Sequence, residues 1–198
     1  IGRAHIRILA GLPAEQGRLA AIVDPTPAGA ELAANQLLRS GCRRFGWLNT
    51  LPSTWAGRMR GEAFSRALQA RGVDIERDLA HLACPEEGYV GGEQAAALAD
   101  EVPEGIFCAN AQLACGFLDG MRQRGKQAPE DFQLIGFDNT PPTAQYSYQL
   151  TTLHQDVAAI SRQALARLLE RTADPLQPSR TTWVEVTLIH RRTSPFVI

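Results

Sequence analysis

Short apolar runs alternate along the chain with longer stretches in which apolar residues recur every three or four positions. The short runs are typical of buried strands, and the recurring pattern is typical of helices that bury one face. We therefore predict strands at residues 6–9, 19–24, 43–49, 80–84, 105–109, 132–137 and 149–153. Helices are predicted at residues 26–41, 56–72, 88–100, 111–125 and 156–171.

The ends of the helices carry recognisable signals. Thr26 is placed as the N-cap of the first helix, with Pro27 at its first helical position, and Asp156 as the cap of the last helix. Left-handed glycines are expected to end three helices, at Gly41, Gly72 and Gly125. The first helix is expected to bury Ala30, Ala33, Ala34, Leu37 and Leu38, and the apolar stripe of the last helix is Val157, Ile160, Ala164, Leu165 and Leu168.

The alternation of strands and helices predicts an α/β fold. Such a chain forms a parallel sheet with right-handed crossovers and helices on both faces, and ligands bind beyond the carboxyl ends of the strands. The end of the chain follows a different pattern, because residues 181–192 alternate with a period of two. Val184, Val186 and Leu188 lie on one face of this stretch, which predicts a late strand at the edge of a sheet.

Composition narrows the class of protein. The 198 residues carry a net charge of −1, with 44% hydrophobic and 21% charged residues, as expected of a globular domain or two small lobes. Lys and Arg form no basic tract that would grip nucleic acid, and no apolar run reaches the roughly 18 to 20 residues of a membrane span. The four cysteines and four histidines show no paired spacing, so we expect reduced thiols, no metal, no cofactor and a cytoplasmic location.

Polar residues follow three of the predicted strands, where a ligand would bind. Asn110 and Gln112 come after the strand at 105–109, and Asp138 comes directly after Phe137. Amides, hydroxyls and a guanidinium suit a sugar or a base held by hydrogen bonds. Glu87 and Tyr89 stand in a turn before a helix and are further candidates. The stretch after Leu48 offers Asn49, Ser53, Thr54, Trp55 and Arg60.

Each candidate also has a plainer interpretation. Asp138 would serve only an Asx turn, Asn110 only a helix cap, and Arg60 only as a solvated helix charge. Trp55 would anchor the core, and the turn holding Glu87 and Tyr89 would face solvent. No nucleophile elbow, phosphate-binding loop or dinucleotide fingerprint is present, so the residues predict ligand binding without catalysis.

Taken together, these blocks resemble the effector-binding core of the LacI/GalR family of bacterial transcription regulators. The resemblance runs over nearly the whole chain, from "VDPTPAGAELAANQLLRSGCRRFGWL" and "RMRGEAFSRALQARGV" to "LTTLHQD" and "VEVTLIHRRTS". Its most specific part is "GIFCANAQLACGFLDGMRQRGKQAPEDFQLIGFDNT", which parallels the family's sequence nearly in register.

The resemblance implies a periplasmic-binding-protein-like fold of type I. Two doubly wound parallel-sheet lobes would be joined by three crossing strands, with the effector between the lobes and the first lobe incomplete. Residues 1–24 and 155–183 are assigned to the N-terminal lobe, and residues 25–154 and 184–198 to the C-terminal lobe. The crossings are expected at "VDP", around "LTTLHQ" and just before "TWVEV", and the family's helix-turn-helix domain is expected to be absent from this chain.

The resemblance also implies roles for single residues. By matching position, Arg60, Asn110 and Asp138 correspond to the family's central polar contacts with the effector, and Thr54 and Trp55 fall in a loop that often lines the pocket. Three positions depart from the family's pattern. Ala111 replaces a usual aspartate, Glu87, with Tyr89 close by, stands where a stacking aromatic is common, and "LAGLP" lacks an acidic residue. They indicate either an unusual effector or a pocket that has drifted.

The function implied is that of a repressor-type regulator. It would bind a sugar or purine-like effector, act as a cytoplasmic homodimer without a membrane partner, and alter the operator DNA affinity of a missing N-terminal domain through its lobe angle. Two alternatives stay open. An exported solute receptor of a transporter would share the fold, although the unpaired cysteines argue against it. An enzyme on a doubly wound sheet would need a nucleophile or phosphate loop that the sequence lacks.

Overall fold

The computed structural model describes residues 7–10, 19–23, 26–50, 55–84, 86–174, 176, 178 and 180–196. They fall into two compact units. Unit 1 comprises residues 1–26 and 155–186, and unit 2 comprises residues 27–154 and 187–198.

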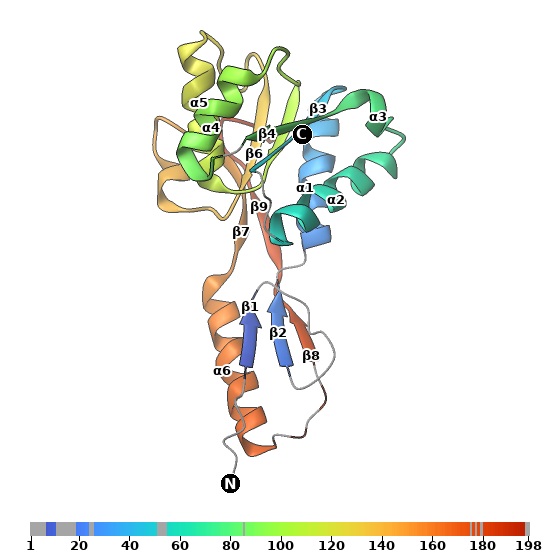
Figure 1. The fold of residues 1–198 in the computed structure, drawn as a ribbon, viewed down its shortest axis with the longest axis vertical. Coiled ribbons are helices and arrows are strands. Elements are labelled where there is room, and N and C mark those ends of the chain that lie inside the picture. The colour runs from blue at the N-terminus through green and yellow to red at the C-terminus, as the bar shows by residue number, and fades with distance from the viewer. Residues whose placement is uncertain are drawn as a thin grey trace. The chain divides into compact units, whose positions relative to one another are not determined.

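Unit 2 is built on a six-stranded sheet in the order β4-β3-β5-β6-β7-β9 (Figure 1). The pairs β3–β4, β3–β5, β5–β6 and β6–β7 are parallel, as the alternating sequence predicts. The strands span Phe45–Thr50 (β3), Leu79–Cys84 (β4), Gly105–Cys108 (β5), Gln133–Phe137 (β6), Thr151–Gln155 (β7) and Val186–Ile189 (β9).

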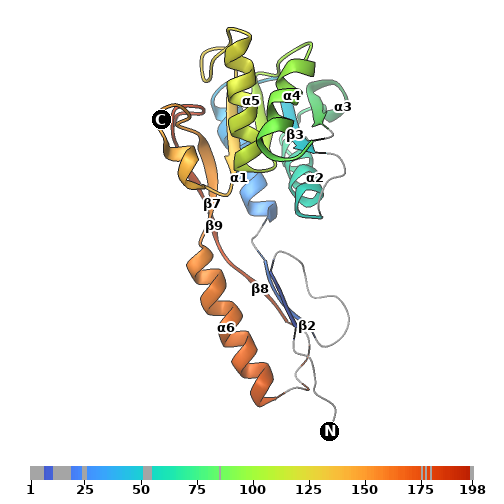
Figure 2. The ribbon, with the colours of Figure 1, turned by 60° about the vertical axis from the view of Figure 1, so that its left-hand side comes forward.

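Helices cover both faces of this sheet. In Figures 1 and 2, α1 and α2 lie on one side of the sheet, and α4 and α5 lie side by side on the other. The helices cover the two faces of the sheet, so the loops lie at its two remaining sides, where the strands begin and where they end. The helices span Thr26–Arg39 (α1), Trp55–Gln69 (α2), Ile75–Asp78 (α3), Gly88–Leu98 (α4) and Ala111–Gln123 (α5), with a 3-10 turn at Pro141–Ala144 (η1).

Most of the predicted helix signals in unit 2 are confirmed. Ala30, Ala33, Ala34 and Leu37 are fully buried, while Leu38 is partly exposed. The three glycines predicted to end helices have φ angles of 88°, 84° and 73°. The short helix α3 was not predicted, because four residues are too few to show a period; it forms where the Asp74 side chain accepts hydrogen bonds from the first-turn amides.

The core of unit 2 is apolar on both sides of the sheet, as a covered parallel sheet requires. Every residue of β5 is buried. The Phe107 ring on β5 contacts Trp47 on β3 and Phe64 on α2, with ring centroids 5.3 and 5.1 Å apart. Burial of such a side chain contributes about 1.5 to 3 kcal/mol, so the strands form a rigid platform for the loops at their ends.

Helices α4 and α5 approach each other closely because glycines line their contact. A Cβ atom at Gly92 would overlap the Leu113 carbonyl oxygen, and one at Gly116 would overlap the Tyr89 carbonyl oxygen. Only glycine permits this backbone-to-backbone contact. We call it the glycine seam.

Unit 1 contains three strands and one helix. Strands β1 (Arg7–Ala10), β2 (Leu19–Val23) and β8 (Arg180–Trp183) form a parallel sheet in the order β1-β2-β8, and α6 (Val157–Ala173) packs against β1 and β2. The Asp156 carboxylate accepts a hydrogen bond of 2.8 Å from the Ala159 amide, which confirms Asp156 as the cap of α6.

Two expectations need correction. The single late strand at residues 181–192 is wrong, because the chain leaves β8 before Val184 and enters β9 at Val186, in a different sheet. A period of two reports a buried face and does not report which sheet buries it. The stripe of α6 is only partly covered by the described residues, since Val157 and Leu165 are 67% and 57% exposed.

None of the helices that the structure describes combines the length and the apolar character needed to cross a bilayer.

Candidate functional site

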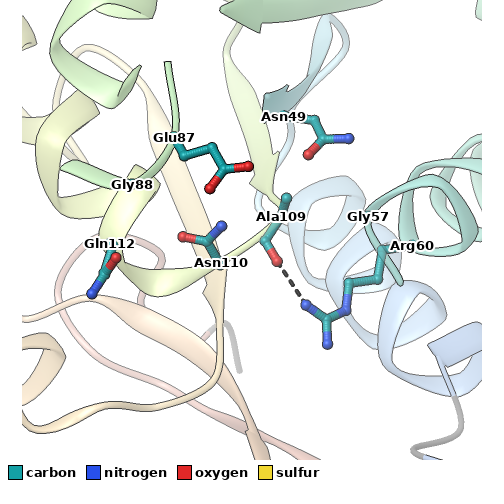
Figure 3. A pocket seen from close by; sticks show the side chains of 8 residues that line it. All are labelled: Asn49, Gly57, Arg60, Glu87, Gly88, Ala109, Asn110 and Gln112. Carbon is teal, nitrogen blue, oxygen red and sulfur yellow. Dashed lines mark hydrogen bonds between the residues drawn. The ribbon is translucent and has the colours of Figure 1, made fainter. Parts of the chain in front are cut away.

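A hollow of about 320 Å³ lies at the carboxyl ends of the unit 2 strands (Figure 3). We call it the carboxyl-edge hollow. All of its lining residues belong to unit 2. They are Asn49, Gly57, Arg60, Glu87, Gly88, Ala109, Asn110 and Gln112.

The topology of the sheet brings these residues together. Asn49 is the next-to-last residue of β3, Ala109 and Asn110 follow β5, and three helices begin nearby: α2, α4 and α5. Parallel strands all deliver their following loops to the same edge, so residues far apart in sequence meet there. Each helix start also presents amide groups without an intrahelical partner and a partial positive charge. The edge is therefore polar even before side chains are considered.

Arg60 is buried in this hollow, although it is charged. It is 9% exposed, and its Nη1 donates a hydrogen bond of 2.8 Å to the Ala109 carbonyl oxygen. Its Nη2 lies 3.9 Å from Oδ1 of Asp138, and its guanidinium carbon lies 3.4 Å from the centroid of the Phe137 ring. A buried cation needs such partners, because desolvation costs several kcal/mol. Arg60 thus joins α2 to the ends of β5 and β6.

Several other polar groups at the hollow are not used inside the protein. Glu87 is the N-cap residue of α4, yet its carboxylate makes no capping hydrogen bond, and in Figure 3 the side chain extends toward Asn110 and Ala109. The Asn110 side-chain oxygen accepts a hydrogen bond of 2.9 Å from the Leu113 amide, which leaves its amide nitrogen. Within the described part of the chain, this nitrogen and the side chains of Asn49, Glu87 and Gln112 have no hydrogen-bond partner. They are available to a ligand.

The structure brings four of the predicted site residues together. Arg60, Asn110 and Glu87 line the hollow, and Asp138 pairs with Arg60. Thr54 and the side chain of Trp55 lie outside the described residues.

Tyr89 is not among the lining residues, because its hydroxyl donates a hydrogen bond of 2.7 Å to Asp119 on α5. Asp119 also accepts from Tyr148 at 2.8 Å and from Arg122 at 2.6 Å. Burial alone would raise the pKa of Asp119, but these three hydrogen bonds outweigh it and hold the pKa below its ordinary value. Burial and the Asp119 carboxylate raise the pKa of Tyr148 to about 12. The cluster ties the segment around Tyr148 to α4 and α5.

Some lining residues carried no signal in the sequence. Gly57, Gly88 and Ala109 have no polar side chain, so only the three-dimensional structure shows that they border the hollow. Asn49 and Gln112 also line the hollow. Their position near the ends of predicted strands is the sequence signal that identifies them as candidate site residues. Among the described residues, no three His, Cys, Asp or Glu side chains are grouped to hold a metal ion. Burial also raises the pKa of the nearby Cys108 thiol, which disfavours a reactive thiolate.

Comparison with known proteins points to one family. The family model described as a periplasmic binding protein-like domain matches residues 34–194. A protein of Mannheimia succiniciproducens named HTH-type transcriptional repressor PurR is 29% identical over 173 residues, which cover 86% of this chain and 52% of that protein. The chain thus spans about half the length of the curated relatives it matches.

Solved structures agree with this match. A LacI family transcriptional regulator from Enterococcus faecium with bound ribose has a TM-score of 0.86 and 25% identity, covering 96% of this chain and 71% of that chain. A dimeric Lac repressor has a TM-score of 0.83 and 20% identity, covering 95% of this chain and 68% of that chain. The predicted periplasmic-binding-protein-like α/β fold is confirmed.

Proposed function

Because the chain belongs to the periplasmic binding protein-like domain family and has PurR-named and LacI-family relatives, we propose that it is the effector-sensing core of a LacI-family transcription regulator. The observation that carries the proposal is the carboxyl-edge hollow. Buried Arg60 lines it, paired with the partly exposed Asp138, and polar side chains without internal partners among the described residues line it too. Such a site binds a small polar molecule through hydrogen bonds and performs no chemistry on it.

The proposed effector is a sugar or a purine-like molecule. Ribose is bound to the Enterococcus faecium relative, and a pentose presents hydroxyl groups that donate and accept at once. The Asp138 and Glu87 carboxylates would accept from such hydroxyls, and the Asn110 amide nitrogen would donate to them. Together with Arg60, these are the proposed binding residues, and Thr54, Trp55 and Tyr89 keep only the support of the sequence resemblance.

The regulatory half of the proposal follows the relatives' names. The PurR proteins are called HTH-type transcriptional repressors, so operator binding is assigned to a helix-turn-helix segment outside these 198 residues. Effector binding would favour one arrangement of the two proposed lobes, and coupling of about 1 to 3 kcal/mol to operator affinity is the usual scale. A cytoplasmic location fits such a role. A transporter receptor is not favoured, because the relatives are named as repressors.

A homodimer is also proposed, by analogy with the dimeric Lac repressor. Its contact surface is placed on α4, α5 and the segment 141–148. Tyr146 is 94% exposed there, and Val90 on α4 is 54% exposed, so both present apolar area to a second copy. A Tyr146→Asp variant should shift the protein toward monomer in light-scattering measurements, and an unchanged mass would remove this surface from the proposal.

The ligand-binding proposal is tested by calorimetry on the purified chain with D-ribose and with hypoxanthine. We expect saturable binding of one of them, and Asp138→Asn should weaken it by about 2 to 5 kcal/mol. The matched control is Asp78→Asn, because Asp78 is also paired with an arginine, Arg77, at 2.6 Å but lies outside the hollow. Equal affinities in wild type and Asp138→Asn would exclude Asp138 from the site.

A further inference from the structure

The turn that carries Asp138 has an unfavourable backbone conformation. Asp138 and Asn139 have φ angles of 90° and 38°, both in the left-handed region that residues with side chains rarely adopt. Two such residues in succession persist only where surrounding contacts hold them. The position of the Asp138 carboxylate beside Arg60 therefore depends on whatever fixes this turn.

Strand β7 supplies part of the restraint. The Asp138 amide donates a hydrogen bond of 2.9 Å to the Leu153 carbonyl oxygen, and the Asn139 amide donates one of 3.3 Å to the Thr152 hydroxyl. The Asn139 side chain makes the other contacts. Its nitrogen lies 3.2 Å from Nδ1 of His154, so the turn is tied to three successive residues of β7.

Arg191 supplies the rest. Its Nη2 donates a hydrogen bond of 2.7 Å to the Asn139 side-chain oxygen. Its Nη1 donates to the Leu150 carbonyl oxygen at 2.8 Å and to the Thr143 hydroxyl at 3.2 Å. The Arg191 backbone is itself fixed, since its amide donates a hydrogen bond of 2.9 Å to the buried Thr151 hydroxyl. One planar guanidinium thus joins the residue before β7, η1 and the Asp138 turn.

Arg191 orients neighbouring groups through hydrogen bonds and does not form an ion pair among the described residues. Among the described residues it has no carboxylate partner, and all its side-chain acceptors are neutral oxygens. Burial lowers its pKa below the ordinary value, so keeping a cation here costs free energy. A lysine would keep the charge but would lack the rigid fork that reaches three acceptors at once.

We propose that Arg191 is a positioning residue of the effector site: through Asn139 it holds the Asp138 turn in its left-handed conformation and keeps the Asp138 carboxylate beside Arg60. Because Arg191 donates to the Asn139 oxygen, the Asn139 nitrogen faces Nδ1 of His154. The site is thereby connected to β7, whose last residue, Gln155, is the first residue of the second segment of unit 1. This inference rests on the proposed function only for the identity of the site.

The first test needs no ligand. Amide hydrogen exchange is measured by NMR on wild type, Arg191→Lys, Arg191→Gln and Asn139→Gly, with Arg192→Gln as matched control. Arg192 is the neighbouring arginine, exposed and paired with Glu130 at 3.1 Å. We expect exchange at the Asp138 and Asn139 amides to rise by about ten-fold in the first three variants, because a hydrogen bond to a charged donor is lost. Ile135 within β6 and the control variant should not change.

Asn139→Gly separates the contribution of the side chain from that of the backbone, because glycine adopts positive φ without strain and lacks the side-chain amide that contacts Arg191 and His154. If exchange rises equally at Ile135, Arg191 serves global stability and the proposal is wrong. If exchange at Asp138 stays at the wild-type rate in all three variants, the proposal is equally wrong.

The second test uses D-ribose and a double-mutant cycle. Arg191→Gln should weaken binding by about ten-fold in the wild-type background but by less than about two-fold in an Asp138→Gly background, if Arg191 acts through Asp138. The same loss in both backgrounds would contradict the proposal. If wild type does not bind D-ribose, the pentose assignment fails, and the exchange result still decides whether Arg191 holds the turn.

Discussion

Two hollows of nearly equal size lie at opposite edges of the unit 2 sheet, and only one of them has the features of a ligand site. The carboxyl-edge hollow measures about 320 Å³ and the second about 330 Å³. We call the second the amino-edge hollow, because it lies where β3 and β4 begin. It is lined by Leu38, Cys42, Arg43, Arg44, Phe45, Arg71, Gly72, Val73, Arg77 and Asp78.

The amino-edge hollow has more arginines, yet they are used by the fold. Arg71 donates to the Asn35 side chain and, at 2.8 Å, to the Ala67 carbonyl oxygen. Arg77 pairs with Asp78, and Arg44 lies 3.3 Å from Glu104. The hollow also adjoins the ends of α1 and α2, whose carbonyl groups carry partial negative charge and attract cations. These arginines complete helix ends and ion pairs.

The comparison teaches that the number of charges does not mark a binding site. At the carboxyl edge, helices begin, and polar side chains such as Glu87 and Gln112 have no internal partner among the described residues. At the amino edge, helices end, and the charged side chains already have partners. Polar groups that the fold leaves unused are the better indicator of a ligand.

Replacing one arginine at each edge should give the largest contrast. Arg60→Met removes the buried guanidinium that donates to the Ala109 carbonyl oxygen and should lower the free energy of unfolding by about 1 to 3 kcal/mol, because that buried acceptor loses its partner. It should also abolish measurable D-ribose binding. Arg71→Met should cost less than about 1 kcal/mol and leave binding unchanged, since its contacts are near the surface. Urea denaturation and calorimetry measure both quantities, and equal losses in the two variants would erase the distinction between the edges.

The charge at the carboxyl edge should select among ligands. Glu87 adds a carboxylate with no ion-pair partner among the described residues, so D-ribose should bind more tightly than D-ribose 5-phosphate. Glu87→Gln should narrow this difference by about 1 kcal/mol, or roughly five-fold, as expected for two charges several ångströms apart in a partly solvated site. Glu86→Gln, one residue earlier and outside the lining, is the matched control. Unaltered selectivity in Glu87→Gln would mean that its carboxylate does not face the ligand.

A carboxylate near the amino edge should act on stability alone. Glu104 accepts hydrogen bonds from the Arg43 and Arg44 amides at 2.7 and 3.3 Å, and these hold its pKa below the ordinary value of 4.5. Since its folded pKa is depressed, Glu104 stabilises the fold above pH 4.5, and this contribution is lost as the pH falls through the folded pKa. Glu104→Gln should therefore destabilise the protein at pH 7 by less than about 1 kcal/mol, and by less still at pH 3.

The control for that measurement is Glu101→Gln, whose side chain is 88% exposed and 3.7 Å from Arg44. It should leave thermal unfolding at both pH values unchanged. A pH-independent loss in Glu104→Gln would show that the carboxylate charge contributes nothing.

The smallest expected effect concerns a thiol at the amino edge. Burial, followed by the Glu104 charge, raises the pKa of Cys42 to about 11, so little thiolate forms at pH 8. Iodoacetamide should label Cys42 in the native protein at about a hundredth of its rate in urea, and D-ribose should not alter that rate. Mass spectrometry of the labelled peptide measures it. A slower labelling of Cys42 in the presence of D-ribose would indicate that the ligand binds at the amino-edge hollow, which contradicts the proposal.

Much of the fold was predictable, because burial leaves a periodic record in the sequence. The buried face of α1 and the runs that became β5 and β6 were each read from apolar spacing. The pattern failed where the chain changes partners. Between β8 and β9 the alternation continues through Val184, although the strand is interrupted there.

The site was predictable in part. Asp138 and Asn110 stand directly after buried strands, and topology alone places such residues at the carboxyl edge. Glu87 and Tyr89 are two positions apart, and no pattern in the sequence distinguishes the one that lines the hollow from the one that binds Asp119. Arg191 was missed for a different reason. It lies among basic residues near the end of the chain, far in sequence from Asn139, and only folding brings the two within a hydrogen bond.

The glycine seam between α4 and α5 has a consequence for the ligands that the proposed site would accommodate. Glu87 stands at the start of α4 and Asn110 at the start of α5, so the separation of the two helix axes sets the distance between these side chains. Gly92 and Gly116 keep that separation near the minimum that two helices permit. The width of the proposed site between Glu87 and Asn110 is therefore set by the absence of two Cβ atoms between α4 and α5. Substitutions of the lining side chains alone would not change the separation of these helices. A lineage that adapted to a bulkier effector would first have to change the seam.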